Sequence, residues 1–283
     1  MSGPLTRPHS PPAIERTAVL APGLPEVCRL GLATRGGSRL RVADVEHALS
    51  CGVNYLNWCG HPDGLSQAVA RLGAARKRFV IAVQFQARDR QEAAREFDRI
   101  LSELATDYLD IATLYYVESE QEWRELTAPG GVRDYLEEQK RAGRLRLIGL
   151  TTHQRRLAAS WARTGKLDML MIRYNAAHRG AETDLFPVAR QAGLPVVTFT
   201  ALRWKALLRP TPDDPPGFQP PPAPEWYRFC LANPDIAVVL AAPSTRRELD
   251  EVLSLLDDWR PPADSDALRA HGDRVRRHAG AFP

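Results

Sequence analysis

The segment after Pro243 carries the clearest chemical signal in the sequence. Two hydroxyl residues and two arginines follow an apolar run there, namely Ser244, Thr245, Arg246 and Arg247. A strand that runs into a capped helix presents backbone amides at the helix N-terminus, and such amides together with guanidinium groups bind anions such as phosphate. The same pattern also fits an ordinary helix cap with surface arginines, and the sequence leaves both interpretations open.

Two histidines and one group of polar residues offer acid/base or metal chemistry. His153 and His178 are candidate acid/base groups because an imidazole titrates near neutral pH, although a lone histidine is often a structural hydrogen-bonding residue. Cys59, His61 and Asp63 match no zinc or iron spacing, even with His153, so we expect no metal site. The chain has no GxSxG, P-loop or HExxH motif, which leaves hydrolase and nucleoside triphosphatase functions unsupported.

The elements that must position these residues alternate along the chain. Short apolar segments, buried on both faces, are separated by longer amphipathic segments, and this alternation is the signature of parallel βαβ units. The predicted strands are Cys28–Thr34, Tyr55–Trp58, Phe79–Phe85, Leu109–Val117, Leu145–Thr151, Met169–Tyr174, Pro195–Ala201 and Ile236–Ala242. Eight strand–helix pairs predict the α/β class and a parallel (β/α)8 TIM barrel.

Local signals support the helices and weaken the alternative fold. Asp89 and Glu92 form a capping box ahead of apolar residues at helical spacing. The alternative, a doubly wound sheet, needs a glycine fingerprint after the first strand, and only the RGGS segment at residues 35–38 stands there. We therefore keep the barrel as the prediction.

The domain organisation follows from where proline gathers. We expect a Pro-rich N-terminal extension over residues 1–25 and a single barrel domain over residues 26–283. Prolines also crowd the loop at residues 205–225, after the seventh predicted strand. On a barrel this loop lies on the C-terminal face, where it is either a functional lid or a stiff insertion. Residues 264–283 read as a helix with a basic, solvated face.

Composition narrows the range of partners. The chain has 283 residues and is 44% hydrophobic, enough for one large core. Its net charge of +4 comes from Arg and Lys spread along the chain, which favours small anionic ligands over nucleic acid. No apolar run reaches the roughly 18–20 residues of a membrane span, and the four cysteines lack a CxxC pair. We expect a cytoplasmic protein with a small-molecule substrate and no membrane or nucleic-acid partner.

In a barrel, the residues that end each strand converge on one face. The candidate catalytic residues on that face are Asn57, Asp63, Gln84, Tyr115 and His153. Three arginines at the same face, Arg173, Arg179 and Arg203, indicate an anionic group on the substrate.

Five segments of the chain, in this order, resemble the aldo/keto reductase superfamily over about residues 27–256. They are GVNYLN at residues 52–57, the run at 104–114 that is similar to the family's L-x-x-D-Y-I-D-L, LIGLTT at 147–152, YN at 174–175 and FTAL at 199–202. The resemblance implies NADPH-dependent carbonyl reduction in which a Tyr acid is tuned by a Lys and an Asp while a His orients the substrate.

The resemblance also places all four catalytic positions of the family on other residue types. The Asp position is Asn57, the Lys position is Gln84 and the His position is Tyr115. The Tyr position falls near Pro62 or Asp63. Without the Lys cation and the Asp carboxylate, the family's way of tuning a phenol is lost. The chain is therefore identified as a divergent member of the superfamily with altered acid/base residues.

At the cofactor positions that the resemblance implies, the residues match the family better than at the catalytic positions. NADP(H) would contact Thr152 and Asn175 at its nicotinamide end, Phe199 in place of a stacking tyrosine, and Thr200, Leu202, Ser244 and Arg246 or Arg247 along its phosphates. Two positions differ, because the family's nicotinamide-contacting Gln is Met171 and its adenine-side Asn is Val252.

Three functions remain open. The first, which we favour, is an NADP(H)-dependent oxidoreductase in which Tyr115, His153 or Asp63 supplies the proton, since hydride transfer resides in the cofactor. The second is a catalytically silent barrel that binds a ligand or a partner. The third is a non-redox lyase or isomerase that uses the polar cluster Tyr115, Glu118, His153, Arg173 and His178.

Overall fold

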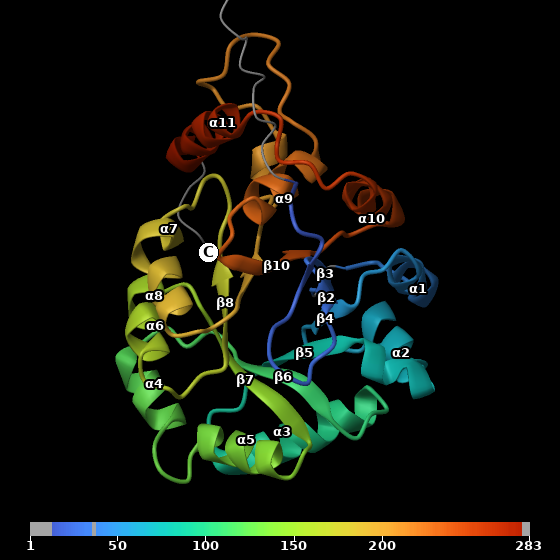
Figure 1. Cartoon of the computed structure of the whole chain (residues 1–283), viewed down its shortest axis with the longest axis vertical. Coiled ribbons are helices and arrows are strands. Elements are labelled where there is room, and N and C mark those ends of the chain that lie inside the picture. The colour runs from blue at the N-terminus through green and yellow to red at the C-terminus, as the bar shows by residue number, and fades with distance from the viewer. Residues whose placement is uncertain (1–12, 36–37, 279–283) are drawn as a thin grey trace, which may run out of the picture.

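Eight parallel strands close into a barrel in the computed structural model, which describes residues 13–35 and 38–278 (Figure 1). The ring order is β10-β3-β4-β5-β6-β7-β8-β9, with every neighbouring pair parallel. The strands are Leu30–Ala33 (β3), Tyr55–Trp58 (β4), Val80–Phe85 (β5), Leu109–Leu114 (β6), Leu145–Thr152 (β7), Met169–Arg173 (β8), Val196–Phe199 (β9) and Ile236–Ala241 (β10). The predicted (β/α)8 barrel is confirmed, and the open-sheet alternative is wrong. Gly36 and Gly37 of the RGGS segment lie outside the described residues.

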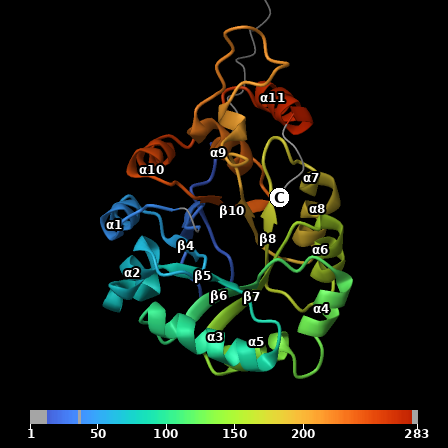
Figure 2. The same ribbon diagram turned by 180° about the vertical axis from the view of Figure 1, so that it is seen from behind.

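Helices form an outer layer around the strands, as Figures 1 and 2 show from opposite sides. They are Val42–Ser50 (α1), Gly64–Ala70 (α2), Arg90–Glu103 (α3), Glu120–Leu126 (α4), Val132–Arg141 (α5), Arg155–Ala162 (α6), Ala181–Asp184 (α7), Phe186–Gln191 (α8), Ala223–Leu231 (α9), Arg246–Leu253 (α10) and Ser265–His278 (α11). Short 3-10 helices cover Gly73–Arg78 (η1), Ala206–Leu208 (η2) and Ser254–Asp257 (η3). Half of the predicted capping box of α3 is present: the Asp89 carboxylate accepts a hydrogen bond from the Glu92 amide at 2.8 Å. The Glu92 carboxylate accepts from the Arg88 amide at 3.1 Å and does not reach the Asp89 amide.

The first predicted strand, Cys28–Thr34, divides into two elements. Val27–Cys28 (β2) pairs antiparallel with Thr17–Ala18 (β1), and the barrel strand begins only at Leu30. Between them, the guanidinium of Arg29 donates to the carbonyl oxygens of Leu231 at 3.0 Å and Ile236 at 2.6 Å. The buried arginine therefore ties the start of the barrel to the connection before β10.

The apolar core has an inner and an outer layer. Alternate strand residues such as Met169 and Met171 fill the barrel, and the intervening residues pack against the helices. Inside the barrel a Cβ at Gly149 would lie only 2.4 Å from the Met169 sulfur and 2.9 Å from Cγ2 of Thr113. Gly149 thus leaves the space that the Met169 side chain occupies.

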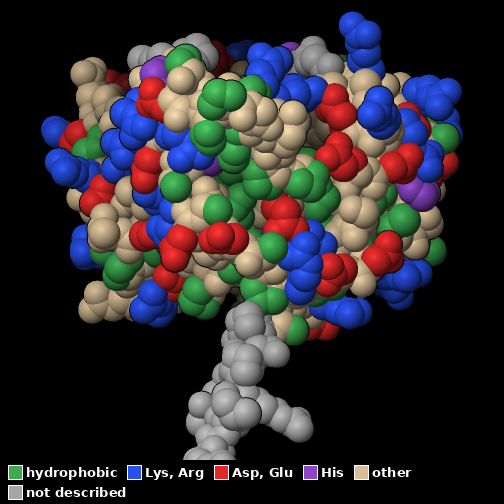
Figure 3. Space-filling model, turned by 90° about the horizontal axis from the view of Figure 1, so that it is seen from above, with side chains coloured by type: hydrophobic (Ala, Val, Ile, Leu, Met, Phe, Trp, Pro, Cys, Tyr) green, Lys and Arg blue, Asp and Glu red, His purple; other side chains and the backbone are tan. Residues whose placement is uncertain are grey.

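The Pro-rich loop after β9 packs against α11 (Figure 1). Asp214 accepts from Arg274 at 2.6 Å, and Asp213 accepts from Arg277 at 2.7 Å. The expected solvated basic face of this C-terminal helix is therefore wrong at Arg274, which is largely buried against Asp214, whereas Arg277 is 59% exposed as expected. On the side of the molecule shown in Figure 3, basic and acidic side chains are interspersed. No helix in the described part of the chain is long and apolar enough to span a bilayer.

Candidate functional site

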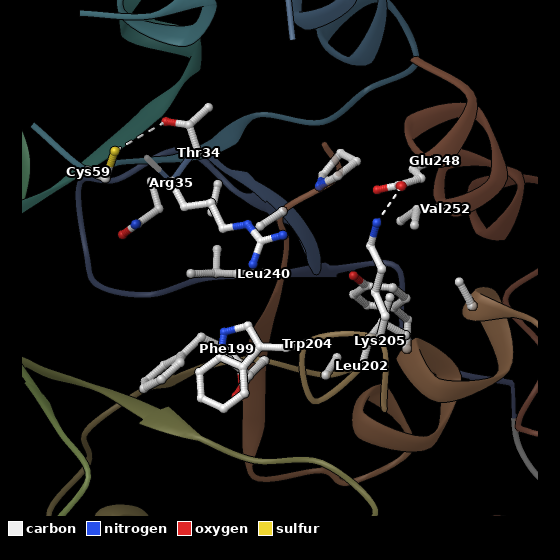
Figure 4. A pocket seen from close by; sticks show the side chains of 18 of the residues that line it. Thr34, Arg35, Cys59, Phe199, Leu202, Trp204, Lys205, Leu240, Glu248 and Val252 are labelled. Atoms are coloured by element: carbon white, nitrogen blue, oxygen red, sulfur yellow. Dashed lines mark hydrogen bonds and ion pairs between the residues drawn. The ribbon is translucent and has the colours of Figure 1, made fainter. Parts of the chain in front are cut away.

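The carboxyl ends of the strands surround a cavity of about 850 Å³. This volume lies in the range of about 300–1,000 Å³ that is usual for small-molecule sites. Figure 4 shows Phe199 and Trp204 on one side of the cavity, Arg35 and Leu240 opposite, and Lys205 with Glu248 at one end. The cavity thus combines apolar and aromatic side chains with charged groups at its rim.

Three predicted catalytic residues from neighbouring strands line this cavity together. Asn57 pairs with Ala82, which lies two residues before Gln84 on β5. Gln84 in turn pairs with Thr113, which lies two residues before Tyr115. Because strand side chains alternate between the two faces, a step of two residues keeps each of these side chains on the inner face of the barrel.

An aromatic wall runs from Tyr115 across to β9. The Tyr115 ring stacks on Tyr116 at 4.0 Å between centroids, Tyr116 lies 4.6 Å from the His153 ring, and His153 meets the edge of Phe199 at 6.0 Å. Burial, with a smaller contribution from the hydrogen bond with Tyr116, raises the pKa of the Tyr115 phenol. Tyr115 therefore keeps its proton throughout the physiological range.

Two buried polar atoms mark the floor of the cavity. Asn57 is 1% exposed and Thr151 is equally buried. Among the residues that the structure describes, neither Oδ1 of Asn57 nor Oγ1 of Thr151 has a hydrogen-bond partner. Buried polar atoms are nearly always paired in proteins, so these two atoms fit a polar ligand in the cavity. Thr151 was not predicted, although it lies on the inner face two residues after Gly149.

Three predicted site residues hold the local backbone and do not line the cavity. Asp63 caps α2, because its carboxylate accepts from the Ser66 amide at 2.9 Å. The Thr152 hydroxyl donates to Glu118 at 3.2 Å. The Asn175 amide donates to the Thr200 carbonyl oxygen at 2.8 Å, which joins the loops after β8 and β9.

His153 is part of the aromatic wall, and its imidazole also contacts a carboxylate. Its Nδ1 is 3.3 Å from Glu118, and its backbone amide donates to the same carboxylate at 2.8 Å. Burial lowers the pKa of His153, although Glu118 opposes this shift. The imidazole is therefore predominantly neutral at pH 7 and is oriented by Glu118.

Cations from three elements line the rim. They are Arg35 after β3, Lys205 after β9 and Arg247 in the first turn of α10. Lys205 pairs with Glu248 at 2.5 Å, and Arg35 donates to the Ser244 hydroxyl at 3.3 Å. These cations could hold a polyanionic ligand along the cavity.

The predicted anion site after β10 is only partly directed at this cavity. Thr245 is the N-cap of α10, and Arg247 lines the cavity. Arg246 instead pairs with Asp250 at 2.7 Å and with Asp44 at 3.6 Å.

Among the described residues, no group of three or more His, Cys, Asp and Glu side chains could hold a metal ion.

The backbone after β9 is strained where it lines the cavity. Thr200, Arg203, Trp204 and Lys205 have φ angles of 58°, 46°, 49° and 69°, a left-handed region that side chains disfavour. Such strain gathers at functional sites, where the surrounding structure must stabilise it. Thr200 and Leu202, both expected to contact a cofactor, lie on this strained segment and line the cavity, as Phe199 does.

Comparison with known proteins agrees with this architecture. Residues 34–229 match the model of the aldo/keto reductase family. The aldo-keto reductase AKR11C1 from Bacillus halodurans, in its holo form, is similar in structure with a TM-score of 0.72, 17% identity and coverage of 92% of this chain and 96% of that one. PA4992 from Pseudomonas aeruginosa, whose description assigns it to the aldo-keto reductases, is similar with a TM-score of 0.66, 17% identity and coverage of 86% and 95%. No curated protein matches the chain.

Proposed function

Since the chain belongs to the aldo/keto reductase family, we propose that it is an oxidoreductase that binds NADP(H) in the barrel cavity. It reduces a small carbonyl compound that carries an anionic group, and its catalytic residues differ from those of the family. The observation that carries this proposal is one continuous cavity that joins Asn57, Gln84 and Tyr115 in its interior to the cations Arg35, Lys205 and Arg247 at its rim.

The residues of the cavity fit a dinucleotide. Phe199 offers an aromatic face to a nicotinamide ring, and the buried Oγ1 of Thr151, which lines the same cavity, is a polar atom that a carboxamide group would satisfy. At the rim, Lys205 and Arg247 are placed to hold phosphates. When bound, NADPH supplies the hydride.

Tyr115 is the proton donor that this arrangement favours. Its phenol lines the cavity and keeps its proton because burial raises its pKa. The amides of Asn57 on β4 and Gln84 on β5 line the same cavity and can donate hydrogen bonds to a carbonyl oxygen that gains negative charge. His153 and Asp63 suit the role less well, because Glu118 engages the imidazole and the carboxylate caps α2.

Arg247 is the residue that we assign to the 2′-phosphate that distinguishes NADPH from NADH. It is exposed and lines the cavity, whereas the neighbouring Arg246 is engaged by Asp44 and Asp250.

We also propose a cytoplasmic location, which the four free cysteines support.

Titration calorimetry with NADPH and NADH tests the proposal, followed by NADPH oxidation with a panel of aldehydes and ketones. We expect NADPH to bind, and we expect Tyr115→Phe to retain that binding while turnover falls by about 10²–10⁴-fold, the usual effect of a general acid. Failure of both cofactors to bind would refute the proposal. Cofactor binding without turnover of any substrate would favour a silent ligand-binding barrel, a function that also suits the differences that the resemblance implies at the four catalytic positions.

A further inference from the structure

We infer that the thiol of Cys59 is a covalent capture site for α,β-unsaturated aldehydes and ketones that enter the barrel cavity. The sulfur bonds to the β-carbon of such a compound, a reaction that the proposed hydride transfer does not include. This inference goes beyond the proposed function, and the capture step requires no cofactor.

Cys59 is placed at the cavity by the strand that precedes it. It is the first residue after β4 and lies two residues beyond Asn57, and both residues line the cavity. Two residues of a strand span about 6–7 Å, so the thiol lies one step closer to the barrel mouth than the Asn57 amide. Because Trp58 pairs with Val83 in the register of β4 and β5, Gln84 follows at the level of Cys59.

A residue from the neighbouring strand contacts the sulfur. Thr34, which follows β3, is 3% exposed, and its Oγ1 lies 3.9 Å from Sγ of Cys59. Figure 4 shows this contact at the side of the cavity from which Arg35 also extends. Either atom can donate in this pair. When the hydroxyl donates, it stabilises the thiolate, which is the nucleophilic form of cysteine.

The other three cysteines lie elsewhere. Cys28 is 8% exposed and Cys230 is fully buried, and burial raises the pKa of both thiols. Cys51 is exposed at the C-cap of α1, with Sγ 3.9 Å from Nε2 of His47. Among the four cysteines, all of which belong to the described part of the chain, only Cys59 lines the barrel cavity. A compound bound in the cavity therefore meets one thiol.

A second observation points to a polar ligand beside this thiol. Asn57 is 1% exposed, yet its Oδ1 has no hydrogen-bond partner among the residues that the structure describes. Buried polar atoms are nearly always paired, so a polar group of a ligand is expected against this side chain. The Asn57 carboxamide can turn about its last side-chain bond and present N–H groups to a carbonyl oxygen. A conjugated carbonyl compound held there extends its double bond toward Cys59.

The reaction balances without an oxidant or a second reactant. The electron pair of sulfur forms the bond to the β-carbon, and the electrons of the carbon–carbon double bond shift toward the carbonyl oxygen to give an enolate. A donor at that oxygen, such as the Tyr115 phenol that lines the cavity, stabilises the enolate. The proton that sulfur loses passes to water or to the imidazole of His61, which also lines the cavity. A proton from water then adds to the α-carbon, which leaves a thioether.

The thioether would occupy the space in front of the inner polar residues of the cavity. Asn57, Gln84 and Tyr115 line the same cavity as Cys59, and they are the residues to which we assign the substrate carbonyl group. Capture would therefore also stop reduction. This consequence rests on the proposed function, whereas the capture itself does not.

Phenyl vinyl ketone, in the absence of cofactor, tests the capture, with the adduct located by mass spectrometry of peptides. We expect Cys59 to react before Cys51, at a rate that levels off with ketone concentration because the compound binds in the cavity before the bond forms. Propiophenone, which has the same carbonyl group but no double bond, should form no adduct and should slow the reaction. Iodoacetamide, which lacks a conjugated ketone, should instead react faster at the exposed Cys51.

Two serine variants form a matched pair. Cys59→Ser should lose the phenyl vinyl ketone adduct, and Cys51→Ser should retain it. Asn57→Leu, checked for folding by circular dichroism, should slow capture at Cys59 by about threefold to tenfold, the value of one hydrogen bond. The same variant should leave the rate at Cys51 unchanged.

Two results would overturn the inference. One is modification of Cys51 while Cys59 stays intact in the folded protein. The other is a rate at Cys59 that rises linearly with ketone concentration and does not respond to propiophenone. Capture at Cys59 in a protein that oxidises no NADPH supports the inference and counts only against the proposed function, whereas reduction of aldehydes with no adduct at Cys59 has the opposite meaning.

Discussion

The contact between the Pro-rich loop and α11 depends on Asp214, and we expect Asp214→Asn to loosen it. The Asp214 side chain is 1% exposed and accepts from the Thr211 amide at 2.5 Å, the Thr211 hydroxyl at 2.8 Å and Arg274 at 2.6 Å. Nδ1 of His271 lies 3.3 Å from the Asp214 carboxylate, and the Phe218 ring packs against the His271 ring at 5.1 Å between centroids. Asparagine keeps the shape of the side chain but removes the charge that these donors surround.

The size of the effect follows from the pKa of this carboxyl group. Burial alone would raise it, but hydrogen bonds from Thr211, Arg274 and His271 outweigh burial and lower the pKa of Asp214 to about 2. Against an unfolded-state pKa near 3.8, this shift corresponds to about 2 kcal/mol of stability at neutral pH. For a chain of 283 residues the loss amounts to about 3–4 °C in Tm.

Thermal unfolding followed by circular dichroism between pH 2 and pH 8 measures this contribution. Because the folded-state pKa is depressed, the stabilisation is present above about pH 4 and is lost as the pH falls toward 2, so the two proteins should converge in acid. Asp213→Asn is the control, since Asp213 is 38% exposed and pairs with Arg277 at the surface, and it should leave Tm nearly unchanged. Equal Tm values for Asp214→Asn and the unaltered protein at pH 7 would refute the reasoning.

Three further outcomes are expected. Gly149→Ala should lower stability by about 1–3 kcal/mol in denaturant titrations, because the added Cβ would overlap the Met169 side chain; an unchanged midpoint would show that Met169 moves aside freely. Arg247→Ala should raise the Kd for NADPH by about tenfold and leave the Kd for NADH unchanged. Arg246→Ala should alter neither Kd, because Asp44 and Asp250 already engage Arg246. An equal loss of affinity for both cofactors would show that the 2′-phosphate binds elsewhere. His178→Gln should leave the pH profile of kcat between pH 5 and pH 8 unchanged, because the pKa of His178 is about 3 and the imidazole is neutral throughout this range. If the unaltered protein shows a titration step in this range and the variant lacks it, His178 is not neutral there.

The barrel could be predicted because its signals are local. Each predicted strand overlaps an observed one, and two predicted strands end early where a residue with a positive φ turns the chain. The strand predicted to reach Val117 ends at Leu114 because Tyr116, with a φ of 47°, turns the chain out of the extended conformation. The strand predicted to reach Ala201 ends at Phe199, ahead of Thr200 with its φ of 58°. Sequence propensity gives no warning of a left-handed tyrosine or threonine.

The site was harder to predict because neighbouring residues of a strand point to opposite faces, so an error of one residue selects a side chain on the wrong face. Thr152 was chosen by resemblance, yet it bonds to Glu118 while Thr151 lines the cavity. A strict two-residue alternation from Leu147 would have selected Thr151. Lys205 could not have been found in this way, because its direction depends on a left-handed loop residue and on its ion pair with Glu248.

We propose that the cavity between Phe199 and Arg247 holds NADP(H), and a crystal structure of the protein grown with NADPH would reveal whether it does. We predict cofactor density inside the barrel mouth, with the nicotinamide ring against Phe199 and within reach of Tyr115, and with a phosphate beside Arg247. A structure with that cavity filled only by solvent at saturating NADPH, or with the cofactor bound elsewhere on the molecule, would contradict it.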